Sequence, residues 1–448
     1  MSRSTAVWLI SIPLVILLGL AISYSAPPTR ERDQHYELVK LVVDVLSDVD
    51  QNFVRELDPD ARRKLVEDMI NGGLERLDQH SGFMNAQEFK QFERKSRGSF
   101  GGIGIQVTVD RVTGNLVVTT PIAGTPAFAA GILAGDQILK IDGQAIDSFR
   151  NSQVIELIQG DPGTSVTLTV LHPDESKPVE ITVVRAVIEV ETVLGDHRKP
   201  DDPKEWEYVI DPEKKIAYIR LIEFDEPTAP KLKTVLERLE ADGIRGIVLD
   251  LRGNPGGFLT SAVDVADFFL TEGKIVSTRG RRKQERVYTA KAGGTLFEPP
   301  DGHPIAVLID RSSASASEIV AAALQDHDRA VIVGERSYGK GSVQNVFSME
   351  SQTTALKLTT QSYWRPSGRN IHRFPDSKES DDWGVRPNSG FEITQSDSER
   401  IAFLNSRRRR DILAGKNSHE VKEDAKPVVD KALEKALAYI RSKLGGPA

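Results

Sequence analysis

The sequence predicts a layered α/β core in the second half of the chain, because buried-type strands alternate there with helical stretches. Short apolar runs predict strands at 216–221, 247–251, 305–309, 330–333 and 355–362. Helical spacing of apolar residues predicts helices at 230–241, 260–270, 317–325 and 431–444. We therefore expect an α/β core domain over residues 191–395 and a helical tail over residues 396–448.

The bulk composition is that of a folded soluble protein with two to four domains. The chain has 448 residues, of which 39% are hydrophobic and 27% charged. Its formal net charge of −7 argues against a nucleic-acid binder. We expect the basic run at residues 407–410 to be a solvated helix face. The absence of cysteine excludes cysteine nucleophiles, cysteine metal sites and disulfide bonds.

An apolar run at residues 6–22 follows Arg3 and precedes a Pro-Pro pair. At about 1.5 Å per residue, the run is near the short limit for a helix that crosses a bilayer. Small residues after the run also permit a cleaved signal peptide. Residues 1–26 are therefore predicted to be a signal anchor or a signal peptide, and the rest of the chain is expected outside the cytoplasm in the cell envelope, either inner-membrane-anchored or periplasmic. A buried core helix is the less favoured alternative.

Residues 27–98 are predicted to form a helical region. Apolar residues recur at helical spacing on both sides of a break at Asp58-Pro59-Asp60. A helical hairpin of this size has a poor core of its own. We therefore expect it to pack on the next domain or on a second copy of the chain, which would form a homodimer.

Residues 99–190 are predicted to form a compact domain of short strands and two helices. Apolar and polar residues alternate along the stretches 103–109, 116–118 and 166–170, and helical patterns occupy 125–133 and 152–158. Asp142-Gly143 is a strong turn signal between two of these elements. The polar segment 196–207 that follows the domain is predicted to be an irregular linker.

Ser315 is the candidate nucleophile. It lies where a buried strand turns into a helix, and backbone N–H groups and the positive end of the helix dipole favour nucleophilic catalysis at such a turn. Ser312, Ser313 and Ser317 crowd the same turn. A purely structural explanation stays open, because Ser315 and Glu318 have the spacing of a capping box.

Lys340 is the candidate general base, which a serine hydroxyl needs near neutral pH. None of the eight histidines lies in the context of a known triad. A lysine is a base only when neutral, so burial must lower its pKa. Gly339 and Gly341 permit close packing around its stem, and an extended segment would place Gln344 on the same face, where its amide can orient the amine.

The same segment satisfies most of a phosphate-binding loop, from Gly334 to Lys340. Two features argue against it. Gly341 stands where a serine or threonine hydroxyl should bind magnesium, and residues 342–347 predict a strand where a helix N-terminus should face the phosphate. A nucleotide hydrolase is therefore disfavoured.

Together these motifs resemble the carboxyl-terminal processing protease family, over about residues 36–387. The strongest part is the segment 314–318, followed at the family's spacing by residues 339–341 and then by Gln344. An acidic stretch at residues 376–382 departs from the family pattern and looks like an inserted loop.

The resemblance implies a serine endopeptidase with a Ser–Lys dyad. Ser315 would be the nucleophile, Lys340 the general base and Gln344 the group that orients the base, with no metal and no nucleotide cofactor.

Two further stretches match the family. Residues 250–257 match its glycine-rich loop beside the active site, which implies that Gly256 or Gly257, together with the Ala316 N–H, holds the oxyanion. Residues 77–81 resemble the Leu-Asp-x-His-Ser stretch that closes the family's N-terminal helical region.

The domain at 99–190 resembles a PDZ module. Gly102, Ile103, Gly104 and Ile105 match the loop whose backbone N–H groups receive a peptide carboxylate, and the tail can then add as a strand. The expected partners are proteins or peptides with flexible C-terminal tails. The alternative function is an inactive PDZ scaffold that only binds peptides, against which the intact dyad residues argue.

Overall fold

The computed structural model describes residues 29–110, 114–146, 151–173, 175–202, 204–281, 284–297, 303–411 and 428–445. The chain divides into two compact units, Met1–Leu74 and Glu75–Ala448. The apolar run at residues 6–22 lies outside the described residues. Within the described ranges, no helix combines the length and the hydrophobicity needed to cross a membrane.

The described part of the first unit, from residue 29 on, forms the helices α2 (Thr29–Asn52) and α3 (Pro59–Leu74). Pro59 is the first residue of α3, where its missing N–H is tolerated, and the Asp58 side chain accepts the N–H of Ala61 at 2.7 Å. The predicted break is confirmed. Apolar side chains of α2 are exposed, including Leu38, Leu41, Val42 and Val45.

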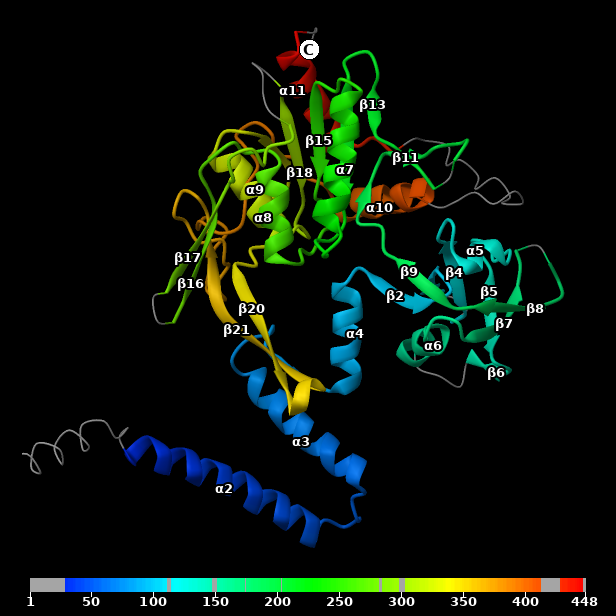
Figure 1. Cartoon of the computed structure of the whole chain (residues 1–448), viewed down its shortest axis with the longest axis vertical. Coiled ribbons are helices and arrows are strands. Elements are labelled where there is room, and N and C mark those ends of the chain that lie inside the picture. Colours follow the sequence, from blue (N-terminus) through cyan, green and yellow to red (C-terminus); the bar gives the residue numbers. More distant parts are fainter. Residues whose placement is uncertain are drawn as a thin grey trace, which may run out of the picture. The chain divides into compact units, whose positions relative to one another are not determined.

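The second unit contains the predicted α/β core (Figure 1). Its main sheet has the order β10-β14-β15-β18-β19, with β13 added beside β14, and β14, β15, β18 and β19 are parallel. The strands are β10 (Val193–Leu194), β13 (Val209–Asp211), β14 (Ile216–Leu221), β15 (Gly246–Asp250), β18 (Ile305–Ile309) and β19 (Val331–Gly334). The helices are α7 (Thr228–Ala241), α8 (Leu259–Asp267), α9 (Ala316–Asp326), α10 (Asp397–Asp411) and α11 (Lys431–Lys443).

The strands are apolar on both faces because helices cover both faces. Ile219, Leu249 and Val307 belong to one hydrophobic cluster with residues of α7, α8 and α9. The alternate residues, such as Val248 and Leu308, belong to a second cluster with α11. This alternation explains why the strands show continuous apolar runs in the sequence.

An antiparallel sheet lies beside this core in the same unit. It joins β1, β21, β16 and β17, with β20 paired to β21 in a long two-stranded ribbon (Figure 1). The strands are β1 (Gly82–Met84), β16 (Lys274–Gly280), β17 (Glu285–Thr289), β20 (Ser342–Met349) and β21 (Thr354–Trp364). The 3₁₀ turn η2 (Glu350–Gln352) closes the ribbon, and the helix α4 (Ala86–Ser96) follows β1.

The PDZ-like part combines a five-stranded path β3-β4-β5-β7-β8 with two helices, as predicted. Its elements are β2 (Ser99–Gly102), β3 (Ile105–Val109), β4 (Leu116–Pro121), α5 (Pro126–Ala129), β5 (Gln137–Ile141), β6 (Gln144–Ala145), α6 (Asn151–Ile158), β7 (Ser165–Leu171), β8 (Val179–Val184) and β9 (Ala186–Glu189). β3 is at the edge of this sheet, so one side of it has no strand partner among the described residues.

Two local predictions are wrong. The segment 196–207 is not irregular, because β11 (His197–Arg198) and β12 (Trp206–Glu207) pair as a short hairpin. The basic run on α10 is not a solvated face at Arg407, which is only 9% exposed. Its guanidinium binds Asp196, and Arg410 binds the same carboxylate. Asp196, a buried acid on a distant segment, pairs with Arg407 in the interior, whereas Arg410 stays 44% exposed.

Candidate active site

Ser315 lies at the turn between β18 and α9, as predicted, and is 6% exposed. Its φ of 55° is left-handed, a conformation that costs free energy for a residue with a side chain. The turn is held from outside: Ser313 Oγ donates to the Leu251 carbonyl at 2.8 Å, and the Ala314 N–H donates to the Asn254 carbonyl at 3.0 Å. The glycine-rich loop therefore fixes the serine turn.

Lys340 lies in the loop between β19 and β20, and the two flanking glycines are needed for packing. A Cβ at Gly339 would lie 2.7 Å from the Arg373 Cβ, and one at Gly341 would lie 2.3 Å from the His372 nitrogen. The chain at 372–373 therefore rests directly on the lysine loop. β20 follows as a strand, so no helix begins after Lys340 and the phosphate-loop alternative has no structural support.

One fully buried carboxylate, that of Glu318, joins the two loops. It accepts the N–H of Ser315 at 2.8 Å, of Lys340 at 2.8 Å and of Gly339 at 2.7 Å, and the hydroxyl of Ser337 at 2.6 Å. Burial raises its pKa to about 7, although these four hydrogen bonds oppose the shift. Glu318 therefore fixes the backbones of the candidate nucleophile and the candidate base relative to each other.

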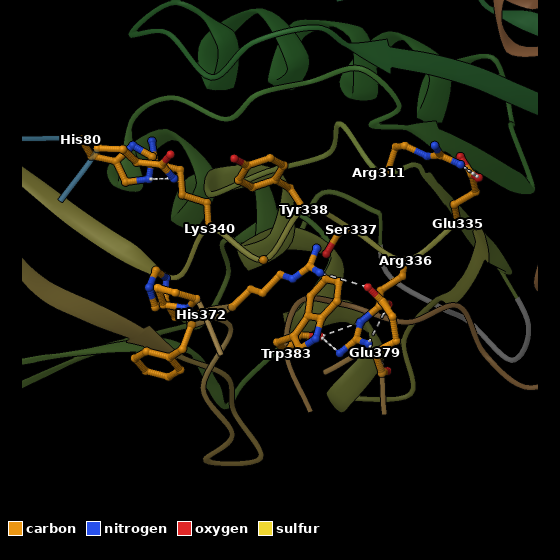
Figure 2. A pocket seen from close by; sticks show the side chains of 15 residues that line it. His80, Arg311, Glu335, Arg336, Ser337, Tyr338, Lys340, His372, Glu379 and Trp383 are labelled. Carbon is orange, nitrogen blue, oxygen red and sulfur yellow. Dashed lines mark hydrogen bonds and ion pairs between the residues drawn. The ribbon is translucent and has the colours of Figure 1, made fainter. Parts of the chain in front are cut away.

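The Lys340 side chain lines a pocket of about 780 Å³ (Figure 2). Burial lowers the pKa of its amine, Lys357 adds to the shift, and the Glu318 charge opposes it. This is the direction a general base requires. His80 lines the same pocket, and its pKa is lowered by burial and by the Lys340 charge.

The two residues of the predicted dyad share Glu318 through their backbones, but their side chains are not hydrogen-bonded to each other. Among the described residues, no hydrogen bond joins Ser315 Oγ to the Lys340 amine. The serine instead contributes a hydrogen bond to the buried Tyr363, whose pKa is raised to about 12 by burial and lowered in part by that bond.

Gln344 belongs to a polar chain between β20, β21 and the stretch at 77–81. Its Nε2 donates to Ser342 Oγ at 2.9 Å and to Thr359 Oγ1 at 3.1 Å. The Thr359 hydroxyl donates to Asp78, and the Ser81 hydroxyl accepts the Thr359 N–H. The Leu-Asp-x-His-Ser stretch thus braces the strand opposite Gln344, and a bond from Gln344 to the lysine amine stays a prediction.

The glycine-rich loop packs against the serine turn. A Cβ at Gly256 would lie 2.8 Å from the Ser315 Cβ and 2.9 Å from the Ala316 nitrogen. The Gly256 N–H donates to Asn254 Oδ1 at 2.8 Å. Among the described residues, the N–H groups of Gly257 and Ala316 make no hydrogen bond, so these two are the available donors.

A buried ionic cluster stabilises the start of the glycine-rich loop. Arg252 donates to Asp250 at 2.6 Å and to Asp430 at 2.8 Å, and the Tyr218 hydroxyl donates to Asp250 at 2.6 Å. Burial alone would raise the pKa of Asp250, but Arg252 and these hydrogen bonds lower it overall. Because Asp430 directly precedes α11, the C-terminal tail contributes to the support of the glycine-rich loop.

The predicted carboxylate-binding loop lies between β2 and β3. Gly104 has a φ of 82°, and a Cβ there would lie 2.3 Å from the Thr125 Cβ. Ile103 is fully buried, and its carbonyl accepts the N–H of Ala127 at 2.9 Å. Gly102 pairs in β2, and Ile105 opens the edge strand β3.

Comparison with known proteins identifies the family. The model of peptidase family S41 matches residues 215–387, and that of the PDZ domain matches residues 101–183. A carboxy-terminal-processing protease of Bartonella bacilliformis is 36% identical over 443 residues, which cover 95% of this chain and 93% of that protein. The chain belongs to the carboxy-terminal-processing protease family.

Other members of the processing protease family are also similar. A carboxyl-terminal-processing protease of Synechocystis sp. is 30% identical over 350 residues, covering 78% of this chain and 71% of that protein. The solved photosystem II D1 C-terminal processing protease is 26% identical, with a TM-score of 0.43, over 78% of this chain and 86% of that one. The family models and the curated relatives identify the chain as an S41 serine peptidase with a PDZ domain.

Sequence reasoning missed two features of this processing protease. Glu318 was weighed only as the structural half of a capping box, although its carboxylate also reaches the lysine loop. The Ser-x-x-Glu spacing was the available signal. Thr359 had no such signal, because its link to Asp78 joins residues 281 positions apart.

Proposed function

We propose that this processing protease is an endopeptidase that cleaves the C-terminal tails of exported proteins with Ser315 as nucleophile and Lys340 as general base. The observation that carries the proposal is the Glu318 carboxylate, which binds the backbone N–H of both residues at 2.8 Å. The lowered pKa of the buried Lys340 amine supports the role of base.

In the proposed reaction, the Lys340 side chain turns from its pocket toward Ser315, with the backbones of both residues held by Glu318. The neutral amine takes the hydroxyl proton as Ser315 Oγ bonds to the scissile carbonyl carbon. The oxyanion accepts hydrogen bonds from Ala316 and Gly257, a contribution of about 3 kcal/mol per donor in other hydrolases. Lys340 then protonates the leaving amine, and water hydrolyses the acyl-enzyme to restore the serine.

The PDZ domain would capture the substrate tail. Gly102, Ile103, Gly104 and Ile105 form the loop proposed to receive the terminal carboxylate, and the free edge of β3 can pair with an extended chain. Capture would hold a flexible tail near the protease core and raise its effective concentration there.

Cleavage of casein by the full-length protein tests the dyad. Ser315→Ala and Lys340→Ala should each abolish cleavage, and Gln344→Ala should weaken it by roughly tenfold if the amide orients the base. A serine-reactive phosphonate should label the wild type and not Ser315→Ala. Full activity of Lys340→Ala would contradict the base assignment, and an absence of both cleavage and labelling in the wild type would favour the inactive scaffold.

We also propose that the apolar run at residues 6–22 directs the protein to the cell envelope, and that two copies associate through the exposed apolar residues of α2. Membrane fractionation and protease accessibility of intact cells test the first point. Sedimentation of wild type and a Leu38→Glu, Leu41→Glu double variant tests the second, since loss of a dimer is expected only in the variant.

A further inference from the structure

The lysine pocket has one wall that the proposed mechanism does not use. This wall comes from the segment 372–383, which contains the acidic stretch at 376–382; His372, Glu379 and Trp383 are labelled in Figure 2. It is joined to the lysine loop near both ends: the Arg373 N–H donates to the Gly339 carbonyl at 2.8 Å, and the Val385 N–H donates to Ser337 Oγ at 2.7 Å. The wall therefore keeps a fixed position relative to Lys340.

The acidic stretch is ordered by one arginine. The Arg336 guanidinium lies 3.3 Å from the centre of the Trp383 ring and donates to the carbonyls of Glu379 at 2.7 Å and Asp381 at 2.6 Å. The Trp383 indole N–H donates to the Lys378 carbonyl at 2.9 Å. These contacts to backbone carbonyls and to the Trp383 ring give the loop a defined shape around Arg336.

The pocket offers both apolar and cationic contacts to a ligand. Tyr338 and Phe374 line it and are 48% and 51% exposed, so both rings are open to an apolar ligand. Three arginines and two carboxylates also line it, so the balance of charge favours an anion even with a neutral Lys340. The five charged side chains are Arg311, Arg336, Arg373, Glu335 and Glu379.

Arg373 has an ion pair that is exposed on both sides and can exchange its partner. Arg336 is bound by carbonyls, and Arg311 is paired with Glu335 at 3.0 Å. Arg373 is 46% exposed, and its ion pair at 3.1 Å is with Glu379, which is itself 74% exposed. An exposed pair of this kind contributes only about 0.2 to 1 kcal/mol, so another carboxylate can replace Glu379.

We propose that this pocket is a specificity subsite that takes a large apolar substrate side chain next to an acidic one, with Arg373 binding the substrate carboxylate in place of Glu379. The aromatic pair Tyr338 and Phe374 would cover the apolar side chain. The inference rests on the proposed function, because the pocket is near the scissile bond only if Ser315, whose turn Glu318 ties to the lysine loop, is the nucleophile. It assigns a substrate class, namely tails with an acidic residue beside a large apolar one.

Mapping of cleavage sites tests the subsite. The full-length wild type, Arg373→Glu, Phe374→Ala and Glu379→Gln are each incubated with a mixed peptide library, and the products are sequenced by mass spectrometry. Lys378→Glu is the matched control, since it makes the same charge change on the same loop outside the pocket lining. Matched peptides with aspartate, asparagine or lysine at the mapped position then give kcat/KM ratios.

The wild type should prefer an acidic residue beside a large apolar one at a fixed position from the cleaved bond. Arg373→Glu should lower the aspartate-to-lysine ratio of kcat/KM by roughly tenfold, and Phe374→Ala should remove the apolar preference. Glu379→Gln, which removes the competing carboxylate without a charge reversal, should raise the ratio about twofold to threefold. Lys378→Glu should keep the wild-type profile.

An unchanged cleavage profile in both Arg373→Glu and Glu379→Gln would overturn the subsite while leaving the dyad intact, since cleavage would still depend on Ser315. A change of the same size in Lys378→Glu would also overturn it, because the effect would then be general electrostatics of the loop. No cleavage by the wild type would overturn both the subsite and the proposed function.

Discussion

Two fully buried carboxylates flank the serine turn, and they are stabilised in opposite ways. Asp250, behind the glycine-rich loop, is paired with the buried Arg252 and hydrogen-bonded by Tyr218. Glu318, beside the lysine loop, binds three backbone N–H groups and the Ser337 hydroxyl, and none of these donors is charged. The pKa of Asp250 is lowered, whereas that of Glu318 is raised to about 7.

The opposite pKa shifts of the two carboxylates follow from the groups that each one binds. Arg252 is a permanent cation, so Asp250 keeps its charge and the scaffold behind the glycine-rich loop is fixed. A permanent cation beside Lys340 would take up space next to the lysine loop. It would also pair with the Glu318 carboxylate, whose oxygens bind the backbone of that loop. Glu318 instead supplies oxygen atoms to the backbone of that loop, and its charge acts on the Lys340 amine, whose pKa it raises against the effect of burial.

The largest effect is expected when the cation of the Asp250 cluster is removed. Arg252→Met leaves Asp250 and Asp430 without their guanidinium, and breaking one partner of a buried pair typically costs about 3 to 5 kcal/mol. Urea unfolding followed by tryptophan fluorescence measures the loss of stability. The exposed pair of Lys233 and Glu237 on α7 provides the control.

Lys233→Ala should change the free energy of unfolding by less than about 0.5 kcal/mol, because an exposed i,i+4 pair contributes little. If Arg252→Met were as mild as this control, the guanidinium would not be what stabilises Asp250, and the contrast between the two carboxylates would disappear.

A second large effect is expected on catalysis when Glu318 is shortened. Glu318→Ala removes the shared acceptor of the Ser315 and Lys340 N–H groups. Misplacement of catalytic groups by about 1 Å can cost hundredfold in rate, so we expect kcat to fall by about that factor while KM changes little. Peptide cleavage rates, with unfolding measured on the same samples, check the prediction.

The Glu318→Gln variant separates positioning from folding. It keeps the length of the side chain and one acceptor oxygen, so kcat should recover in part. It replaces one of the two carboxylate oxygens, each of which accepts two hydrogen bonds, with an NH₂ group, so recovery should be incomplete. Equal kcat values for the wild type and Glu318→Ala would show that the two loops hold their geometry without this carboxylate.

A smaller effect is expected at the neutral donor of the Asp250 cluster. Tyr218→Phe removes the hydroxyl that donates to Asp250 at 2.6 Å, and a hydrogen bond to a charged group contributes about 1.5 to 3 kcal/mol. The unfolding free energy should fall by less than in Arg252→Met. A loss as large as that of Arg252→Met would mean that the hydroxyl, and not the cation, dominates the stabilisation of Asp250.

Local patterns were sufficient for the α/β core, because its strands are buried on both faces and their apolar runs match β14, β15, β18 and β19. The turn at Ser315 was predictable for a similar reason: strand, turn residues and helix lie within one segment. The burial of Arg407 was not predictable, because its partner Asp196 is 211 positions away in the sequence. The same applies to the pocket wall, where Arg336 orders a loop 43 to 47 positions further along.

The direction in which the Lys340 side chain points could not be predicted from the sequence either. Spacing predicts that Ser315 and Lys340 meet, and Glu318 does bring their backbones together. Which way a long, flexible lysine side chain turns depends on all the walls of its pocket, including His80 from before the PDZ domain and His372 from after β21. Those walls come from segments with no periodic relation to the lysine.

The smallest effect expected is a difference in how stability depends on pH. The pKa of Glu318 rises from 4.5 to about 7 on folding, so the folded protein binds its proton more tightly than the unfolded chain. Its contribution is therefore fully present below about pH 4.5 and is lost as the pH rises through about 7, with a slope of at most about 1.4 kcal/mol per pH unit. Relative to Glu318→Gln, the wild type should lose stability across this range.

The pKa shift of Asp250, and therefore its effect on how stability depends on pH, has the opposite sign. Its pKa is lowered on folding, so its contribution is present above the ordinary value of 3.8 and is lost only as the pH falls through its lower folded value. Urea unfolding between pH 4.5 and 8 should therefore show a constant offset between wild type and Asp250→Asn, and a changing one between wild type and Glu318→Gln. Parallel curves for wild type and Glu318→Gln would mean that the pKa of Glu318 is the same in the folded and unfolded states. The neutral donors around Glu318 would then stabilise its charged form as well as water does.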